Sequence, residues 1–192
     1  MSEDDDLRLV EQLLGEKGLS VRRIEPVRHR KTPDLEILDG LGVPLALCEV
    51  KSPRDDFLEK LWAARPGQTM VGGARPDPVF NRIARQIIHA REQLEAHDPN
   101  RAVARTVAIV NHDRACNVAD LVETVTGRRP GFPFATNPIN PKFTADALQA
   151  IDGIMWVDAK GRSGPSWFFT EAHMPYFDSL QAALGLKGVV RF

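Results

Sequence analysis

The stretch from Lys31 to Pro53, K-T-P-D-L-E-I-L-D-G-L-G-V-P-L-A-L-C-E-V-K-S-P, contains two short apolar runs joined by an Asp-Gly, Gly-rich connection. This pattern predicts a β-hairpin. Because successive strand side chains point to opposite faces, Leu47, Glu49 and Lys51 share one face of the second strand. A hairpin in a suitable register then places Asp34, Glu49 and Lys51 on one surface, at the ends of two paired strands.

Two carboxylates and an ammonium beside apolar strands are costly unless something pairs with them. A hard divalent cation is the natural partner, because Mg²⁺ is usually held by one or two carboxylates together with water and substrate phosphate. We expect Asp34 and Glu49 to hold Mg²⁺, for which Mn²⁺ would substitute, and the backbone carbonyl of Val50 to supply a further oxygen. Lys51 would orient or deprotonate an attacking water and offset developing charge on a phosphate.

The pair Pro33-Asp34, followed across the hairpin by Glu49-Val50-Lys51, resembles the PD-(D/E)xK nuclease superfamily, the restriction-endonuclease-like fold. The resemblance covers roughly residues 4–111 of the chain. It implies an α/β fold with an αβββαβ core, in which helices flank a mixed central sheet, and a metal-dependent endonuclease activity. The alternative is a solvated edge hairpin, but Glu49 follows the apolar run from Val43 to Cys48, where a surface charge is least expected.

The resemblance also implies two site residues on helices. A glutamate from the first helix often completes the metal site in this superfamily, and Glu11, in the helix predicted to run to about Lys17, best matches that position. Many members carry a glutamine on the helix after the hairpin; Gln86 matches it, although Ala90 stands where some members have a tyrosine. That helix is predicted from Asp77-Pro78 to about His97 and carries a polar stripe: Arg82, Gln86, His89 and Gln93. A solvent-facing position is the alternative for both site residues.

Basic residues near the hairpin are candidate phosphate contacts. They are Arg23, Arg28, Arg30 and Lys31 before the hairpin, Arg75 in a Gly-rich segment, and Arg82 on the long helix. A net charge of −1 over 192 residues argues against a generally basic surface, so a DNA contact would be a local patch. A solvated charged face would explain the same residues.

The composition is that of a soluble globular protein, with 43% hydrophobic and 27% charged residues. Its two cysteines, Cys48 and Cys116, provide neither a disulfide framework nor zinc spacing, which fits a reducing cytoplasm. No apolar run reaches transmembrane length and no signal peptide is evident. We therefore expect a cytoplasmic protein without a membrane partner.

We expect residues 1–127 to form the nuclease-like core, and residues 128–192 to be a Pro-rich insertion plus a β-hairpin and a helix that extend the same domain. The hairpin is predicted over Ile151–Val157 and Ser166–Thr170, and the last helix over Tyr176–Leu184.

Two further charged groups are interpreted as turn chemistry. Asp158-Ala159-Lys160 imitates half of the nuclease motif, but no Pro-Asp strand precedes it and glycines follow it. His112 ends the strand predicted over residues 102–110, where a lone histidine is more often a hydrogen-bonded turn residue than a catalytic one.

The leading hypothesis is a Mg²⁺-dependent endonuclease acting on DNA, in restriction, phage defence or DNA repair. Its partners would be DNA and a second copy of the chain, because cutting both strands of a duplex suits two-fold symmetry. The P-D…E-V-K-S tract with a short first helix and a basic first strand also resembles Holliday-junction resolvases.

Two rival hypotheses come from different classes of protein. One is a catalytically silent nucleic-acid-binding module on the same fold, and the second is a hydrolase of a phosphate ester that is not a nucleic acid. The intact Asp34, Glu49 and Lys51 favour an active site, because a silent one has no physical reason to keep buried charges.

Overall fold

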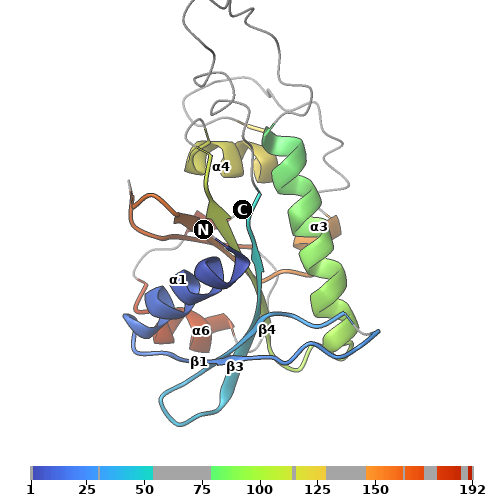
Figure 1. The fold of residues 1–192 in the computed structure, drawn as a ribbon, viewed down its shortest axis with the longest axis vertical. Coiled ribbons are helices and arrows are strands. Elements are labelled where there is room, and N and C mark those ends of the chain that lie inside the picture. Colours follow the sequence, from blue (N-terminus) through green and yellow to red (C-terminus); the bar gives the residue numbers. More distant parts are fainter. Residues whose placement is uncertain are drawn as a thin grey trace, which may run out of the picture.

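The computed structural model describes residues 2–29, 31–53, 79–113, 116–128, 146–161, 163–170, 177–186 and 190–191. Within these ranges, seven strands form one mixed sheet whose strand order follows the sequence (Figure 1). The strands are β1 (Ser20–Arg23), β2 (Leu35–Leu38), β3 (Pro44–Lys51), β4 (Ala104–Asn111), β5 (Gly153–Asp158), β6 (Ser166–Phe169) and β7 (Val190–Arg191). The labelled helices are α1 (Glu3–Gly15), α3 (Val79–His97), α4 (Val118–Thr126) and α6 (Phe177–Ala183). The predicted α/β class is therefore confirmed.

The first part of the chain follows the predicted order of helix, three-stranded meander, helix and strand. Strands β1, β2 and β3 pair antiparallel in succession, whereas β4, which follows α3 in the chain, lies parallel to β3. The C-terminal strands continue the same sheet, because β5 pairs parallel with β4 and β6 pairs antiparallel with β5. Strand β7, which pairs with β6, was not predicted from the sequence.

The hairpin of β2 and β3 has the predicted alternation of faces. Leu35 pairs with Cys48, and both side chains are buried in the core beneath α1. Leu47 on β3 instead packs into the core beneath α3. The connecting turn is closed by backbone hydrogen bonds of Asp39, and Gly42 has φ 80°, a conformation that favours glycine.

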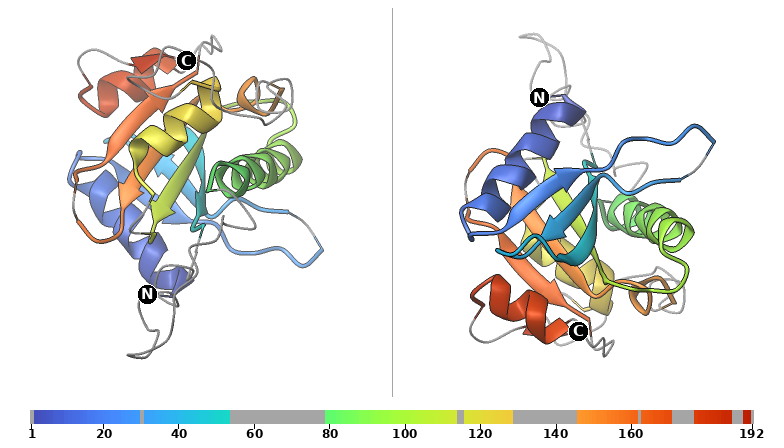
Figure 2. Two further views of the ribbon diagram at one scale, coloured as in Figure 1. Left: turned by 90° about the horizontal axis from the view of Figure 1, so that it is seen from above. Right: turned by 90° about the horizontal axis from the view of Figure 1, so that it is seen from below.

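The sheet separates two hydrophobic cores. On one face lie helices α1 and α6, and on the other lie α3 and α4 (Figure 2). Val10 and Leu14 of α1 are buried on the first face. Ile83 and Ile87 of α3 are wholly buried on the second. A charged side chain on the α3 face of β3 is thus enclosed by apolar neighbours unless it reaches the edge of the sheet.

Helix α1 is capped at its N-terminus by Ser2. The Ser2 hydroxyl oxygen accepts a hydrogen bond from the backbone N–H of Asp5 at 3.2 Å, and the Asp5 carboxylate accepts one from the Ser2 N–H at 2.6 Å. This reciprocal capping satisfies two backbone donors. It also fixes the orientation of the first turn of the helix.

Strand β1 is shorter than predicted, since the sequence indicated a strand over residues 21–27. Its pairing with β2 ends at Arg23, and the Ile24 N–H then donates to the Asp34 carbonyl at 2.9 Å. Pro26 has no N–H to donate to a ladder, so the chain leaves the sheet here.

Most of the predicted Pro-rich insertion, from residue 129 onward, lies outside the described residues. Among the described residues no helix has the length and apolar character needed to cross a membrane.

Candidate active site at the end of strand β3

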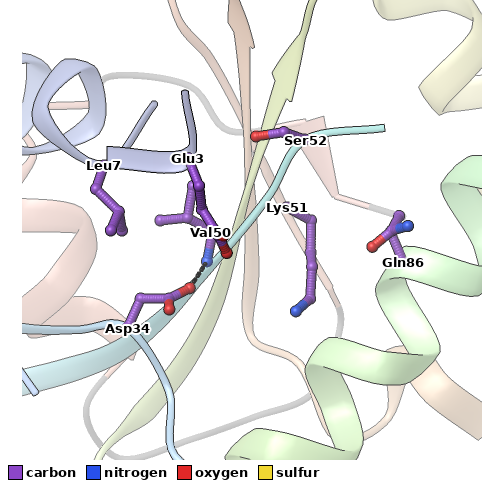
Figure 3. Close-up of a pocket in the computed structure, with 7 residues that line it drawn as sticks. All are labelled: Glu3, Leu7, Asp34, Val50, Lys51, Ser52 and Gln86. Atoms are coloured by element: carbon purple, nitrogen blue, oxygen red, sulfur yellow. Dashed lines mark hydrogen bonds between the residues drawn. The ribbon is translucent and has the colours of Figure 1, made fainter. Parts of the chain in front are cut away.

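A pocket of about 470 Å³ opens beside the carboxyl end of β3 (Figure 3). Helices α1 and α3 contribute to its walls, as does the segment that leads into β2. The lining residues are Glu3, Leu7, Asp34, Val50, Lys51, Ser52 and Gln86. Three residues predicted as site residues from the hairpin, Asp34, Val50 and Lys51, therefore share one cavity.

Asp34 reaches the pocket from the position just before β2. Leu35 is the first β2 residue paired with β3, opposite Cys48, so Asp34 lies one residue beyond the ladder. Its Oδ2 accepts a hydrogen bond from the Val50 backbone N–H at 2.8 Å (Figure 3). This side-chain bond continues the link between the strands where the backbone ladder stops, and it holds a carboxylate against β3.

Glu49 is the buried member of the site, with only 1% of its surface exposed. It is not among the residues that line the pocket, but its Oε1 forms an ion pair with the Nζ of Lys51, which does line it. The second oxygen, Oε2, is buried and has no hydrogen-bond partner among the described residues. A buried carboxylate oxygen without a donor is unfavourable. It is the atom that a bound cation would satisfy.

Both carboxylates have pKa values above their ordinary range, mainly because they are buried. Burial raises the pKa of Glu49 to about 7, with the negative charge of Asp34 adding to this and Lys51 opposing it. Burial also raises the pKa of Asp34, against the effect of the Val50 N–H and the Lys51 charge. At neutral pH the negative charge at the site therefore exceeds the positive charge of Lys51, and Glu49 readily retains a proton.

Lys51 is held from α3 by a residue that the sequence analysis did not single out. The Gln93 Oε1 accepts a hydrogen bond from the Lys51 Nζ at 2.7 Å. Gln86, the predicted residue, lines the same pocket seven residues earlier on the helix. The signal was present in the polar stripe of α3, but helical spacing alone does not say which turn of the helix stands opposite β3.

The first helix contributes a different carboxylate from the one predicted. Glu11 forms two hydrogen bonds with Arg23, at 2.5 and 2.9 Å, and does not line the pocket. The α1 carboxylate that does line it is Glu3, in the first turn (Figure 3). Glu11 lies on α1, as predicted, but the N-terminus of the helix, and not its middle, lies at the end of β3.

A buried hydrogen-bonded group fixes that first turn. Asp6 is wholly buried, and its two oxygens contact the Ser52 Oγ at 2.7 Å and the His112 Nε2 at 2.9 Å. Ser52 directly follows β3 and His112 directly follows β4, so Asp6 ties α1 to two adjacent strand ends. His112 is a hydrogen-bonded residue at a strand end, as the sequence analysis interpreted it.

The predicted phosphate contacts are dispersed and several are paired with acids. Arg23 contacts Glu11 and also Asp4, and Lys31 pairs with Glu92 at 2.6 Å. The Arg82 guanidinium, 13% exposed, lies 3.6 Å from the Asp113 carboxylate. Arg28 is exposed in the loop between β1 and β2. Arg30 and Arg75 lie outside the described residues.

The residues present fit a hard cation that is coordinated by only one or two protein carboxylates. Among the described residues no cluster of three or more His, Cys, Asp or Glu side chains is arranged to hold a metal ion. Mg²⁺, however, is commonly held by one or two carboxylates, with waters and substrate oxygens completing its shell. Asp34 and Glu49 could provide that pair of carboxylates. The Glu49 Oε2, which has no hydrogen-bond partner among the described residues, is free to accept a ligand.

No protein-family model, curated protein or solved structure matches this chain. Its fold and site define a class: an α/β protein in which two carboxylates and one ammonium gather at the end of a buried strand. Such groups can hold a hard cation, contact a phosphate through Lys51, and exchange a proton near neutral pH through Glu49, whose pKa is about 7.

Proposed function

We propose that this protein is a Mg²⁺-dependent nuclease that hydrolyses phosphodiester bonds in DNA at the site formed by Asp34, Glu49 and Lys51. The observation that carries the proposal is the buried Glu49 Oε2, which has no partner among the described residues and lies in a carboxylate pair whose pKa values are both raised. Burying incompletely paired carboxylates lowers the stability of the folded protein unless a ligand compensates for the missing interactions.

The residues that would hold Mg²⁺ are Asp34 and Glu49, with the carbonyl of Val50 and the carboxylate of Glu3 as further oxygens. When bound, the ion would polarise a phosphoryl oxygen and lower the pKa of a coordinated water. Mn²⁺, which accepts the same oxygen ligands, should replace it.

The chain's own residues supply the remaining chemistry. The Lys51 ammonium lines the pocket and can donate to a phosphate oxygen as negative charge develops there. The same group can orient a water for attack, since Gln93 and Glu49 hold it in place and leave one of its three N–H donors. Glu49, whose pKa is about 7 in the metal-free site, would give up its proton when it binds the ion.

The topology supports a nuclease assignment for the hairpin. Asp34 precedes the second strand of an antiparallel meander, Glu49 and Lys51 lie at the end of the third, and the fourth runs parallel to the third. This order is the one that the αβββαβ core implies. Arg28 and His29, which are exposed on the loop that leads towards Asp34, are candidate contacts for the phosphates of a nucleic acid.

The test is cleavage of supercoiled plasmid, single-stranded DNA, a four-way junction and RNA, each with Mg²⁺, with Mn²⁺ and with EDTA. Asp34→Asn and Lys51→Ala should lower the cleavage rate by at least about a thousandfold, because each removes a group needed at the reacting phosphate. Lys17→Ala, at an exposed position after α1, is the matched control and should cut like wild type.

The choice of substrate would separate a resolvase-like enzyme, which prefers the junction, from a nuclease that cuts plain duplex. Metal-dependent cutting that survives both site substitutions would refute the assignment. Binding of DNA without cutting under any metal would point instead to a binding module on this fold.

A further inference from the structure

Gln93 connects two parts of the site that are distant in the sequence. Its side-chain oxygen accepts a hydrogen bond from the Lys51 Nζ at 2.7 Å, and its side-chain nitrogen donates one to the Thr32 carbonyl at 3.3 Å. An amide can do both because it carries an acceptor and two donors on one planar group. A carboxylate or an apolar side chain of the same length could make at most one of the two bonds.

The neighbouring helix residue strengthens this connection. Glu92 forms an ion pair with Lys31 at 2.6 Å, so two consecutive residues of α3 hold two consecutive residues of the chain. The loop between β1 and β2 accordingly lies alongside α3 (Figures 1 and 2). The held segment continues through the buried Pro33 directly into Asp34. The position of Asp34 therefore depends on the same face of α3 as the position of Lys51.

The Lys51 ammonium has two partners, and they differ in kind. Glu49 lies two residues away on the same strand and carries the charge that attracts the ammonium. Gln93 is neutral and comes from a helix that packs on the sheet from the α3 side. Without Gln93, the ammonium would keep its electrostatic partner but lose the contact that sets its direction across the pocket.

We propose that Gln93 is a positioning residue that fixes the Lys51 ammonium relative to Asp34, by bonding Lys51 on one side and the Thr32 carbonyl on the other. Its contribution to cleavage rests on the proposed nuclease function, whereas the positioning itself does not. Two substitutions distinguish the hydrogen bond of Gln93 to Lys51 from its hydrogen bond to Thr32. Gln93→Met removes both bonds, and Gln93→Glu keeps an acceptor for Lys51 while removing the donor to Thr32.

The experiment is competitive acetylation with acetic anhydride, in which mass spectrometry compares the labelling of Lys51 with that of the exposed Lys17 in the same molecule. Gln93→Met should raise the relative labelling of Lys51 by about fivefold, because its nitrogen loses an acceptor and is less shielded. Gln93→Glu should leave it at or below the wild-type value. Amide hydrogen exchange in peptides spanning residues 31–38 should quicken in both variants, because both lose the bond to Thr32.

The matched control is Gln12→Met, the same substitution at an exposed glutamine of α1 whose side chain donates to Glu16, the C-cap residue of that helix, at 3.0 Å. It should alter neither readout. Unchanged Lys51 labelling in Gln93→Met, or equal increases in the Met and Glu variants, would overturn the positioning role.

The nuclease assay then tests the link to function. Gln93→Met should lower kcat by about tenfold and leave KM within about twofold, because misplacement of a reacting group affects the transition state more than substrate binding. If Lys51 labelling responds as expected but the wild-type protein never cuts DNA, the positioning role of Gln93 stands and the nuclease proposal is rejected. If wild type cuts DNA but Lys51 labelling is unaltered in Gln93→Met, the nuclease proposal stands and the positioning role of Gln93 is rejected.

Discussion

Two buried carboxylates at opposite ends of the parallel strands show how differently this fold treats the same chemical group. Asp152, just before β5, is wholly buried, and its Oδ1 accepts from Arg101 at 2.6 Å while its Oδ2 accepts from the Arg105 backbone N–H at 2.8 Å. Glu49, at the other end of β3, pairs one oxygen with Lys51 and leaves the second without a partner in the described chain.

Burial raises the pKa of both groups, but only at Glu49 does a neighbouring charge raise it further. At Asp152 the Arg105 N–H and the Arg101 charge lower the pKa again. At Glu49 the nearest acid, Asp34, raises it further, to about 7. Asp152 is therefore a structural carboxylate with both oxygens hydrogen-bonded. Glu49 has an oxygen without a hydrogen-bond partner among the described residues, as expected of a group that binds a ligand.

We expect the greatest change from loss of the satisfied carboxylate. Asp152→Ala leaves the Arg101 charge and the buried Arg105 N–H without their acceptor, so the free energy of unfolding should fall by about 3 kcal/mol. Urea denaturation followed by circular dichroism measures this. Glu49→Gln, measured without metal at pH 8, is the contrasting variant and should be at least as stable as wild type. Equal destabilisation by both would remove the distinction between the two carboxylates.

The next prediction is the pH dependence of stability that Glu49 contributes. Its folded-state pKa of about 7 lies above the ordinary 4.5, so the folded protein binds more protons than the unfolded chain in that interval. The resulting stability is complete below pH 4.5 and is lost as the pH rises through 7, by about 3 kcal/mol. Wild type minus Glu49→Gln, compared in EDTA at each pH, isolates this term because Asp152 is common to both. A flat difference would contradict it.

A third effect concerns metal affinity. A cation bound by Glu49 must displace its proton, so the Mn²⁺ association constant should rise about tenfold per pH unit below 7 and level off above it. Isothermal titration calorimetry measures the constant, and buffers of different ionisation enthalpy report the released proton. Affinity that does not change between pH 5.5 and 7 would mean that Glu49 is not a ligand.

The weakest effect distinguishes the two glutamates of α1. Glu3→Gln removes a charge that lines the pocket, and it should weaken Mn²⁺ binding by about threefold. Glu11→Gln should leave the affinity unchanged, because Glu11 is engaged by Arg23 away from the pocket. The same titration compares them. A larger loss from Glu11→Gln would restore the sequence-based assignment.

The hairpin and its faces were predictable because strand alternation is a local rule. Leu35 and Cys48 pair as a hairpin requires, and the ends of α4 follow equally local rules, with Asn117 as the N-cap and Gly127 at φ 69°. The missed features are long-range. Gln93 acts from a position 42 residues after Lys51, and the described residues of β7 form two residue pairs with β6.

Local sequence was enough to specify which groups meet at the end of β3: Asp34 and Lys51 line one pocket, and Glu49 is buried beside it. Period-2 alternation and hairpin pairing fix that outcome within about twenty residues of chain. The helix residues that complete the site depend instead on tertiary packing. Helical spacing defines a stripe but not its height against the sheet, and that height is set by how Val10, Leu14, Ile83 and Ile87 pack in the two cores. Packing therefore brought Glu3 and Gln93 to the site, and left Glu11 on Arg23.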